Sequence, residues 1–380
     1  MIYLDNAATT FPLPECVCDE MDRLNRSLSV NAGRGSYKYA TEASRIIEQT
    51  REKLGMLLGV ADGRVIFSSS ATIALNQIFG GRQWNRGDVV YVSPYEHNSV
   101  LRPLYSFAKR YCFEIYELPL TSGMGINLEL MKDMFSMNKP DLVCLTHVSN
   151  VTGYVLPIRE IAAEAKSCGA EVLIDASQSA GLLSVDMSDI DYLVFAGHKT
   201  LYGPFGAAGM ILGRNTKLLP YLSGGTGSDS LSFDMPESMP LMYEPGSMNI
   251  SAIGGLGAAL DCISDFGITN IYNHEKKLTE RLIKGLAQIE GVTLYLPSDL
   301  NEHVGIVSFN IEGYTADECG KILDLDFDIA VRTGYHCAAL IHKHLKDKDY
   351  RGTVRASVGL FTREEDLDAL ISAVKSIAEE

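Results

Sequence analysis

Short, nearly continuous runs of apolar residues recur through the middle of the chain. Six of them predict buried strands, at residues 64–69, 88–94, 141–149, 171–177, 191–197 and 207–213. Amphipathic segments lie between several of these runs. Residues 124–137 and 157–169 have helical spacing, and Gly169 is placed as a C-terminal stop. Alternating strands and helices predict an α/β fold with a mainly parallel sheet between helices.

The pattern changes after about residue 220. Residues 223–249 are rich in Gly, Ser, Pro and Met and predict a long loop, which in a compact chain is usually functional. Further elements are predicted beyond it: helices near 251–266 and 269–289, a strand at 304–311, and a closing helix with Thr362 as N-cap and Glu365 as its capping-box partner. This part of the chain is predicted to be a smaller α+β domain.

Two domains are predicted because 380 residues are too many for one hydrophobic core. We assign residues 12–250 to a large α/β domain, and residues 1–11 with 251–380 to the smaller one. The segment GGLGAAL, residues 254–260, superficially resembles a dinucleotide-binding loop. It follows no strand and lies in a helical pattern, so close helix packing explains its small residues better.

Composition excludes several classes of function. A net charge of -15 with no basic stripe argues against nucleic-acid binding. No apolar run approaches the roughly 20 residues that cross a bilayer, and the N-terminus lacks the pattern of a signal peptide. Eight scattered cysteines without a C-x-x-C pair are typical of reduced thiols in the cytoplasm. We therefore expect a cytoplasmic protein without a membrane or nucleic-acid partner.

Residues that can carry chemistry follow several of the predicted strands. Lys199 leaves a strand into a Gly-rich turn, where desolvation would make its amine able to form a Schiff base. Asp175 ends another strand and could pair with a pyridinium nitrogen. Thr72 lies in a strand–turn–helix segment that suits a phosphate, and His97 and Asn150 follow two further strands. Each is more often structural when taken alone, but together they mark the ligand-binding edge of an α/β sheet.

Seven motifs carry a resemblance to a known family: YLDNAATT, EHNSVLRPL, HVSNVTG, IDASQSAG, GHKTLYGP, RTGYHCA and TVRAS. In this order, and across essentially the whole chain, they resemble the cysteine desulfurases of the class V aminotransferase group. The resemblance implies the fold type I architecture of pyridoxal-phosphate enzymes. This architecture has a mainly parallel, seven-stranded sheet between helices and a smaller α+β domain.

The resemblance assigns five residues to the ring of a pyridoxal 5'-phosphate cofactor. Lys199 would bind the cofactor aldehyde as a Schiff base, and Asp175 would keep the pyridine nitrogen protonated. His97 would stack on the ring and move protons. Gln178 would hydrogen-bond the phenolic oxygen, with Asn150 near that oxygen and the substrate.

The same resemblance assigns the phosphate and the substrate carboxylate. The backbone of Ala71 and the side chains of Thr72 and His198 would hold the phosphate. Ser247 would reach into the phosphate site of a neighbouring subunit, which makes the protein a homodimer. Arg355 would clamp the substrate carboxylate, a task suited to its fork of donors.

Cys337 lies where the family has its sulfur acceptor. The pattern R-x-G-x-H-C around it resembles the second group of the family, whose cysteine sits on a short ordered loop. A free thiol is only a few per cent thiolate at neutral pH, and Arg332 or His336 beside the sulfur would raise that fraction. Cys337 is therefore predicted to be the nucleophile.

Two other interpretations of Cys337 stay open. It could be a structural thiol, as most cysteines are. It could also bind zinc together with His336, His342 and His344, although their spacing matches no standard ligand pattern. Residues 340–347 are instead predicted to be a helix end with solvated basic side chains, and no metal is expected.

The resemblance implies an enzyme that converts L-cysteine to L-alanine and keeps the sulfur on Cys337 as a persulfide. A second thiol or an acceptor protein would then remove that sulfur. Alternatives are a selenocysteine lyase acting on L-selenocysteine, another class V β-lyase or aminotransferase, or a non-catalytic protein that binds a partner. Three positions depart from the family pattern: Tyr37, Ala196 and Tyr335.

Overall fold

The computed structural model describes residues 1–380 except 34, 61–63, 229 and 380. Seven strands of this described chain form one sheet in the order β2-β8-β7-β6-β5-β3-β4. They are β2 (Val65–Ser68), β3 (Val89–Val92), β4 (Glu114–Glu117), β5 (Leu142–Thr146), β6 (Glu171–Asp175), β7 (Tyr192–Ala196) and β8 (Ala208–Leu212). β8 runs opposite to the other six strands, which are parallel to one another, so the predicted mainly parallel sheet is confirmed.

Sequence periodicity located every strand of this sheet except β4. Glutamates at 114 and 117 bound an Ile-Tyr pair in β4, so its pattern is not an apolar run. This strand lies at the edge of the sheet, where a polar surface is tolerated. The other six strands are largely buried, and this is why their sequences are nearly continuously apolar.

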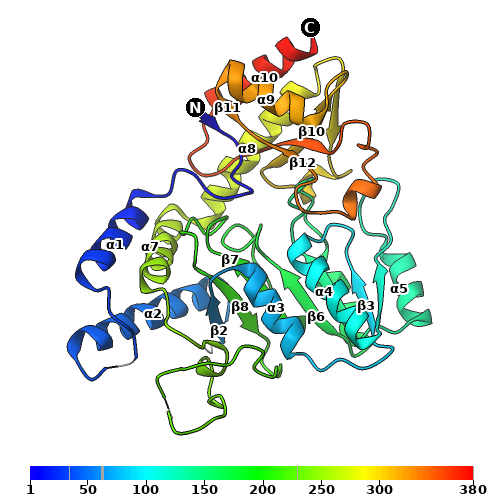
Figure 1. Cartoon of the computed structure of the whole chain (residues 1–380). Coiled ribbons are helices and arrows are strands. Elements are labelled where there is room, and N and C mark those ends of the chain that lie inside the picture. Colours follow the sequence, from blue (N-terminus) through cyan, green and yellow to red (C-terminus); the bar gives the residue numbers. More distant parts are fainter. Residues whose placement is uncertain (34, 61–63, 229, 380) are drawn as a thin grey trace.

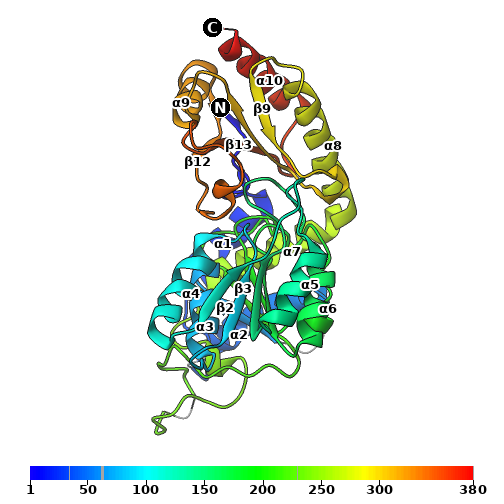
Figure 2. The same ribbon diagram turned by 90° about the vertical axis from the view of Figure 1, so that its right-hand side faces the viewer.

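Helices cover both faces of the sheet (Figures 1 and 2). The helices α3 (Ala71–Gly81) and α4 (Asn98–Tyr111) pack on one face, and α5 (Leu128–Met137) and α6 (Ile158–Ser167) pack on the other. Alternate strand residues supply the two cores. Val90 and Val92 join the cluster under α3 and α4, whereas Tyr91 joins the opposite one.

Small residues in α7 (Ile250–Phe266) let it pack closely against α1 (Glu15–Ser27) and α2 (Lys38–Leu57). A Cβ on Gly254 would lie 2.3 Å from the Leu24 side chain, and one on Gly257 would lie 2.5 Å from that of Thr50. Close helix packing is therefore the correct explanation of GGLGAAL. No single helix among the described residues is long and apolar enough to cross a membrane. The helices α7 and α8 (Ile268–Leu286) are long and apolar enough only when taken together, and they are bent by 79° relative to each other.

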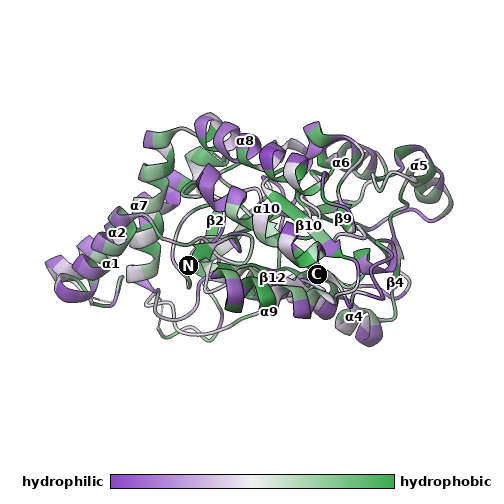
Figure 3. Cartoon of the chain, turned by 90° about the horizontal axis from the view of Figure 1, so that it is seen from above, coloured by the Kyte–Doolittle hydropathy of each residue, from purple (hydrophilic) through white to green (hydrophobic). Residues whose placement is uncertain are grey.

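A second, antiparallel sheet in the described ranges has the order β12-β13-β10-β9. Its strands are β9 (Val292–Tyr295), β10 (Ile306–Ile311), β12 (Arg332–Gly334) and β13 (Thr353–Ser357). The helices α9 (Ala316–Phe327) and α10 (Glu364–Ala378) lie next to it. The N-terminal β1 (Ile2–Tyr3) pairs with β11 (Ile329–Ala330) beside this sheet. In Figure 3 the central β10 is hydrophobic, and α8 at the edge carries hydrophilic residues. The predicted boundaries at residues 11 and 250 stay predictions.

Some predicted helix ends were wrong. Helix α10 begins at Glu364, after the Arg363 N–H donates to the Asp366 carboxylate (2.9 Å). The Thr362 hydroxyl instead accepts the Gly359 N–H and closes the preceding turn (3.0 Å). Helix α5 begins at 128 rather than 124, capped by Asn127. The described chain also has short 3-10 helices: η1 (Met187–Asp189), η2 (Leu241–Tyr243), η3 (Leu300–Glu302) and η4 (Ile341–Lys343).

Candidate active site

The carboxyl ends of five strands bring the predicted site residues to one edge of the large sheet. β2, β3, β5, β6 and β7 are mutually parallel, so the segments that follow them emerge at the same edge. The second sheet meets this edge through Arg355 on β13, whose Nη1 donates to the Asn150 carbonyl (2.8 Å). The candidate site therefore lies between the two sheets.

Lys199 follows β7 in a turn that the N-terminal segment holds in place. The Thr9 hydroxyl donates to the His198 carbonyl (3.0 Å), and the Thr10 hydroxyl donates to the Lys199 carbonyl (2.8 Å). Burial lowers the pKa of Lys199 to about 8, Asp175 opposes this shift, and Arg355 adds to it. The amine makes no hydrogen bond to the described residues, and its lowered pKa increases the fraction that is deprotonated and able to attack an aldehyde.

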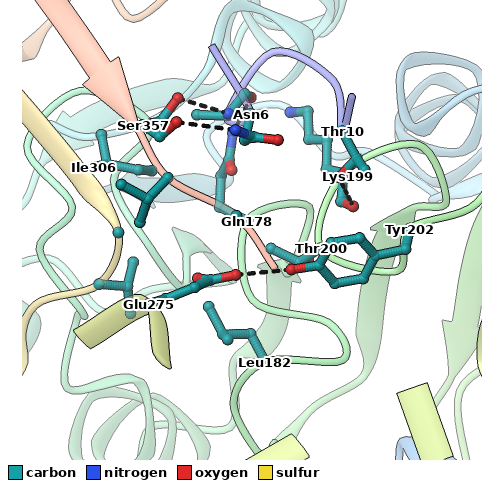
Figure 4. A pocket seen from close by; sticks show the side chains of 15 residues that line it. Asn6, Thr10, Gln178, Leu182, Lys199, Thr200, Tyr202, Glu275, Ile306 and Ser357 are labelled. Atoms are coloured by element: carbon teal, nitrogen blue, oxygen red, sulfur yellow. Dashed lines mark hydrogen bonds between the residues drawn. The ribbon is translucent and has the colours of Figure 1, made fainter. Parts of the chain in front are cut away.

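Figure 4 shows a small pocket that reaches Lys199 from the side of the N-terminal segment. Lys199, Gln178 and Thr10 line it at one end, and a Tyr202–Glu275 hydrogen bond of 2.8 Å lies at the other. Burial raises the pKa of Glu275 to about 7. The Tyr202 N–H also donates to the Lys199 carbonyl (2.9 Å), so the Tyr202–Glu275 hydrogen bond helps to fix the turn that carries Lys199.

His97 and Asp175 both lie close enough to Lys199 to interact with its charge. His97 is the N-cap of α4, and its Nδ1 accepts the Ser99 N–H (3.0 Å), which fixes the ring. Burial and then the charge of Lys199 lower the pKa of His97 to about 4, so the imidazole is neutral at pH 7. The Asp175 carboxylate is buried at the end of β6, and Oδ1 accepts the Ser177 N–H (3.0 Å).

The start of α3 offers an anion site. The Ser70 hydroxyl caps the Ile73 N–H (3.3 Å), while the N–H groups of Ala71 and Thr72 have no partner among the described residues. The buried Nδ1 of His198 also has no hydrogen-bond partner among the described residues, and the His198 ring stacks on Phe205. Burial and Lys199 lower the pKa of His198 to about 4. These groups fit the phosphate of the cofactor that the resemblance implies, and Lys199 and Asp175 fit its aldehyde and its ring nitrogen.

The side-chain amides of Gln178 and Asn150 lie at the site and donate hydrogen bonds to the backbone of other segments around it. The Gln178 Nε2 donates to the Ala7 carbonyl (2.7 Å), and the Asn150 Nδ2 donates to the His336 carbonyl (2.7 Å). Asn150 thereby connects Arg355 to the loop that carries Cys337. The cofactor contacts predicted for both amides stay predictions.

Arg355 is completely buried and forms an ion pair that the sequence analysis missed. Its Nη2 lies 2.6 Å from the Asp5 carboxylate. Burial lowers the pKa of Arg355, and Asp5 opposes that shift. The Nε has no partner among the described residues, so a donor is left for a substrate carboxylate. An acidic residue two positions after β1, within YLDNAATT, was the available signal for Asp5.

Cys337 is exposed on a tightly bent loop after β12. Its φ of 57° and the φ of 45° at His336 are left-handed, a conformation that persists only where the surroundings hold it. The Cys337 carbonyl accepts the Asn98 N–H (2.6 Å), which ties the loop to the start of α4 beside His97. Of the two predicted neighbours, Arg332 contacts the sulfur (Nη2–Sγ 3.5 Å), whereas His336 is buried and faces Thr353.

The segment after Cys337 differs from its prediction. His342 is not solvated: its side chain is 5% exposed and pairs with the buried Asp347 carboxylate. Residues 341–343 form a single 3-10 turn, because the Leu340 and Ile341 side chains anchor them in the core. Within the described ranges, no group of three His, Cys, Asp or Glu side chains is arranged to hold a metal ion.

Ser247 lies apart from the Lys199 cluster. It is exposed ahead of α7, and its hydroxyl accepts a hydrogen bond from Asn31 (3.1 Å). The three departures from the family pattern are also placed. Ala196 ends β7 in the core, Tyr37 is exposed as the N-cap of α2, and Tyr335 is half exposed with its ring edge against His342.

Comparison with known proteins identifies the family of this chain. The model of the aminotransferase class-V family matches residues 2–370. A probable cysteine desulfurase from Methanothermobacter thermautotrophicus is 33% identical over 99% of this chain and 94% of its own length. A cysteine desulfurase from Yersinia pestis is 31% identical over 99% and 93% of the two chains. The chain therefore belongs to the class-V aminotransferase family, among its cysteine desulfurases.

Solved structures confirm the fold. The apo structure of a cysteine desulfurase from Thermococcus onnurineus superposes with a TM-score of 0.90 at 29% identity, and the match covers 100% of this chain and 94% of that one. The S-sulfonic acid form of the cysteine desulfurase CsdA from Escherichia coli gives a TM-score of 0.87 at 27% identity, with the same coverage. The predicted fold type I architecture is correct.

Proposed function

We propose that this protein is a pyridoxal-phosphate-dependent cysteine desulfurase, which converts L-cysteine to L-alanine and takes the sulfur onto Cys337 as a persulfide. The observation that carries the proposal is the position of Cys337. It is an exposed thiol on a loop tied to α4 beside His97, and it interacts electrostatically with Lys199. A transaminase does not need such a thiol.

Pyridoxal 5'-phosphate would bind through residues that the fold already orients. Lys199 supplies the amine, and Asp175 supplies a carboxylate for the ring nitrogen. His97 supplies a neutral imidazole beside the ring. The first N–H groups of α3, with the Thr72 hydroxyl and His198, would bind the phosphate. When bound, this cofactor supplies an electron sink for bonds at the substrate Cα.

The residues of the chain divide the remaining work among them. Arg355 binds the substrate carboxylate through the N–H that has no protein partner in the described chain. Lys199, as a free amine, removes the Cα proton. The Cys337 thiolate then attacks the substrate sulfur, so that an S–S bond forms and the substrate Cβ–S bond breaks. The electron pair of the broken bond stays with the carbon skeleton, which takes up a proton and leaves as alanine.

The experiment that tests the proposal is product analysis with the reduced, cofactor-loaded protein. L-cysteine should yield alanine, and after a single turnover Cys337 should carry one additional sulfur in a peptide mass spectrum. Alanine without that added sulfur would mean that a thiol other than Cys337, such as the added reductant, takes the sulfur. Pyruvate with free sulfide would point to a β-eliminating lyase, and L-selenocysteine in parallel would reveal a preference for selenium. Consumption of a 2-oxo acid without alanine from L-cysteine would indicate an aminotransferase and contradict the proposal.

We also propose that the protein acts as a cytoplasmic homodimer whose persulfide passes to another thiol, small or on a protein. Eight free thiols favour a reducing compartment. Two apolar side chains on the loop before α7 are almost fully exposed, Leu231 at 94% and Phe233 at 107%, and Ser247 follows them. Sedimentation should give twice the chain mass, and Phe233→Asp should shift it toward the monomer. A monomeric wild type would contradict the homodimer.

A further inference from the structure

Three buried polar side chains lie together next to the Cys337 loop. His336 directly precedes the cysteine and is 2% exposed. The side chains of His342, in η4, and Asp347, in the segment that follows, are 5% and 1% exposed. The ring centroids of the two histidines are 6.1 Å apart. Neither His342 nor Asp347 has a place in the chemistry described above.

The hydrogen bonds of this group define which nitrogen atoms carry protons. The His336 Nε2 lies 3.0 Å from the Thr353 carbonyl oxygen, which can only accept, so Nε2 is the donor. Burial, followed by the charge of Arg355, lowers the pKa of His336, so the ring is neutral and its Nδ1 is an acceptor. The His342 Nδ1 donates to the Asp347 Oδ2.

Three polar atoms of this group are then left without a protein partner. The His336 Nδ1, the His342 Nε2 and the Asp347 Oδ1 are all buried and have no hydrogen bond among the described residues. Buried polar atoms in folded proteins are almost always paired with protein or with ordered water. The two rings are too far apart for a direct N–H···N bond, which needs nitrogen atoms within about 3.2 Å. Their separation suits one water molecule between them.

We propose that Asp347, His342 and His336 form a buried chain, closed by one water between the two rings, that positions the Cys337 loop for sulfur transfer. The proposal rests on the proposed function. His342 is the positioning residue, and it acts through His336. The left-handed backbone at 336 and 337 needs its surroundings to hold it. Asn150 donates a hydrogen bond to the His336 carbonyl, and Thr353 hydrogen-bonds the His336 Nε2. The proposed water and His342 would hold the His336 Nδ1.

Tyr335, one of the three departures from the family pattern, lies beside this buried hydrogen-bonded group. The Tyr335 ring lies edge-on against His342 with centroids 5.1 Å apart, and it shields the imidazole from solvent. The family's second group often has histidine at that position. An aromatic cover makes a hydrogen bond inside the chain stronger, because bulk water no longer competes for it.

Two substitutions separate positioning from simple structural support. His342→Asn keeps a donor for Asp347 but removes the nitrogen that faces His336, whereas His342→Leu removes both. His344→Asn is the matched control, because His344 lies in the same segment but has an exposed side chain, whose Nε2 lies 3.8 Å from the Glu117 carboxylate. The readouts are kcat and KM for alanine release, and the rate at which iodoacetamide alkylates Cys337, followed by peptide mass spectrometry.

For His342→Asn we expect kcat to fall at least about 10-fold with KM unchanged, since a small displacement of a reacting group is enough to cause such a loss. Cys337 alkylation should slow, because the sulfur moves away from Arg332. His344→Asn should match the wild type in both. If His342→Asn behaves like the wild type while only His342→Leu is impaired, the chain is structural and the proposal is overturned.

A crystal structure of the wild type gives a second test that needs no variant. One water within hydrogen-bond distance of the His336 Nδ1 and the His342 Nε2 is expected, and a dry gap or a direct ring contact overturns the proposal. If the wild type releases no alanine, the proposed function fails. The alkylation rates and the water site then decide the inference alone.

Discussion

Replacing Cys337 by alanine should lower alanine release from L-cysteine at least about 1000-fold, as removal of a covalent nucleophile does in other enzymes. Alanine forms only if a nucleophile takes the sulfur, because the electron pair of the Cβ–S bond must stay with the carbon skeleton. The Cys337 Sγ is an exposed thiol, and the Arg332 Nη2 lies 3.5 Å from it. The cofactor absorbance should be unchanged, because Cys337 does not hold the cofactor. The measurement is alanine per enzyme per minute, with and without a thiol reductant.

Cys18→Ala is the matched control for this prediction. Cys18 is also an exposed free thiol, but it lies on α1 and contributes nothing to the site. Its alanine release should equal that of the wild type. Equal release from Cys337→Ala and the wild type would show that another thiol, such as the added reductant, takes the sulfur from the substrate, and the persulfide role of Cys337 would be abandoned.

Replacing Lys199 by alanine should abolish both covalent cofactor attachment and alanine release, again at least about 1000-fold. The wild-type lysine should show a pH dependence of its own during reconstitution of the cofactor-free protein. Only the deprotonated amine attacks an aldehyde, and burial lowers the pKa of Lys199 to about 8. The rate of cofactor binding, followed by absorbance, should therefore rise with pH and level off above about pH 8.

Lys199→Arg is the control that keeps the positive charge without a reactive amine. It should bind the cofactor only reversibly, so that borohydride reduction leaves no cofactor on the protein. Covalent attachment in Lys199→Ala or Lys199→Arg would assign the Schiff base to a different lysine. A midpoint near 10.4, the value of an unperturbed lysine, would mean that Lys199 is solvated in the cofactor-free protein.

Much of the site could be predicted because its residues follow buried strands. Parallel strands deliver their next residues to one edge of a sheet, so Lys199, Asp175, His97 and Asn150 could be grouped before any coordinates were known. The N-terminus of α3 was found for the same reason, since a small-hydroxyl turn joined a strand to a helix. These are local patterns with a single structural solution.

Contacts between distant segments could not be predicted in this way. The pairing of Arg355 with Asp5 joins residues 350 positions apart, and periodicity carries no information about it. The choice between Arg332 and His336 as the neighbour of the sulfur depended on two left-handed residues, which turn one side chain toward the sulfur and the other into the core. The cap of α10 failed because the Thr362 hydroxyl was already used by the preceding turn.

Apolar runs and turn residues were enough to predict six of the seven strands of the large sheet, their order in the chain and the residues at its ligand-binding edge. These follow from apolar runs and turn residues that act within a few positions. Only the tertiary structure decided what surrounds Cys337. His342 has the sequence context of a solvated histidine, yet packing of η4 against the core buries it beside Asp347. Burial of a polar side chain depends on which distant segments cover it, and no local pattern records that.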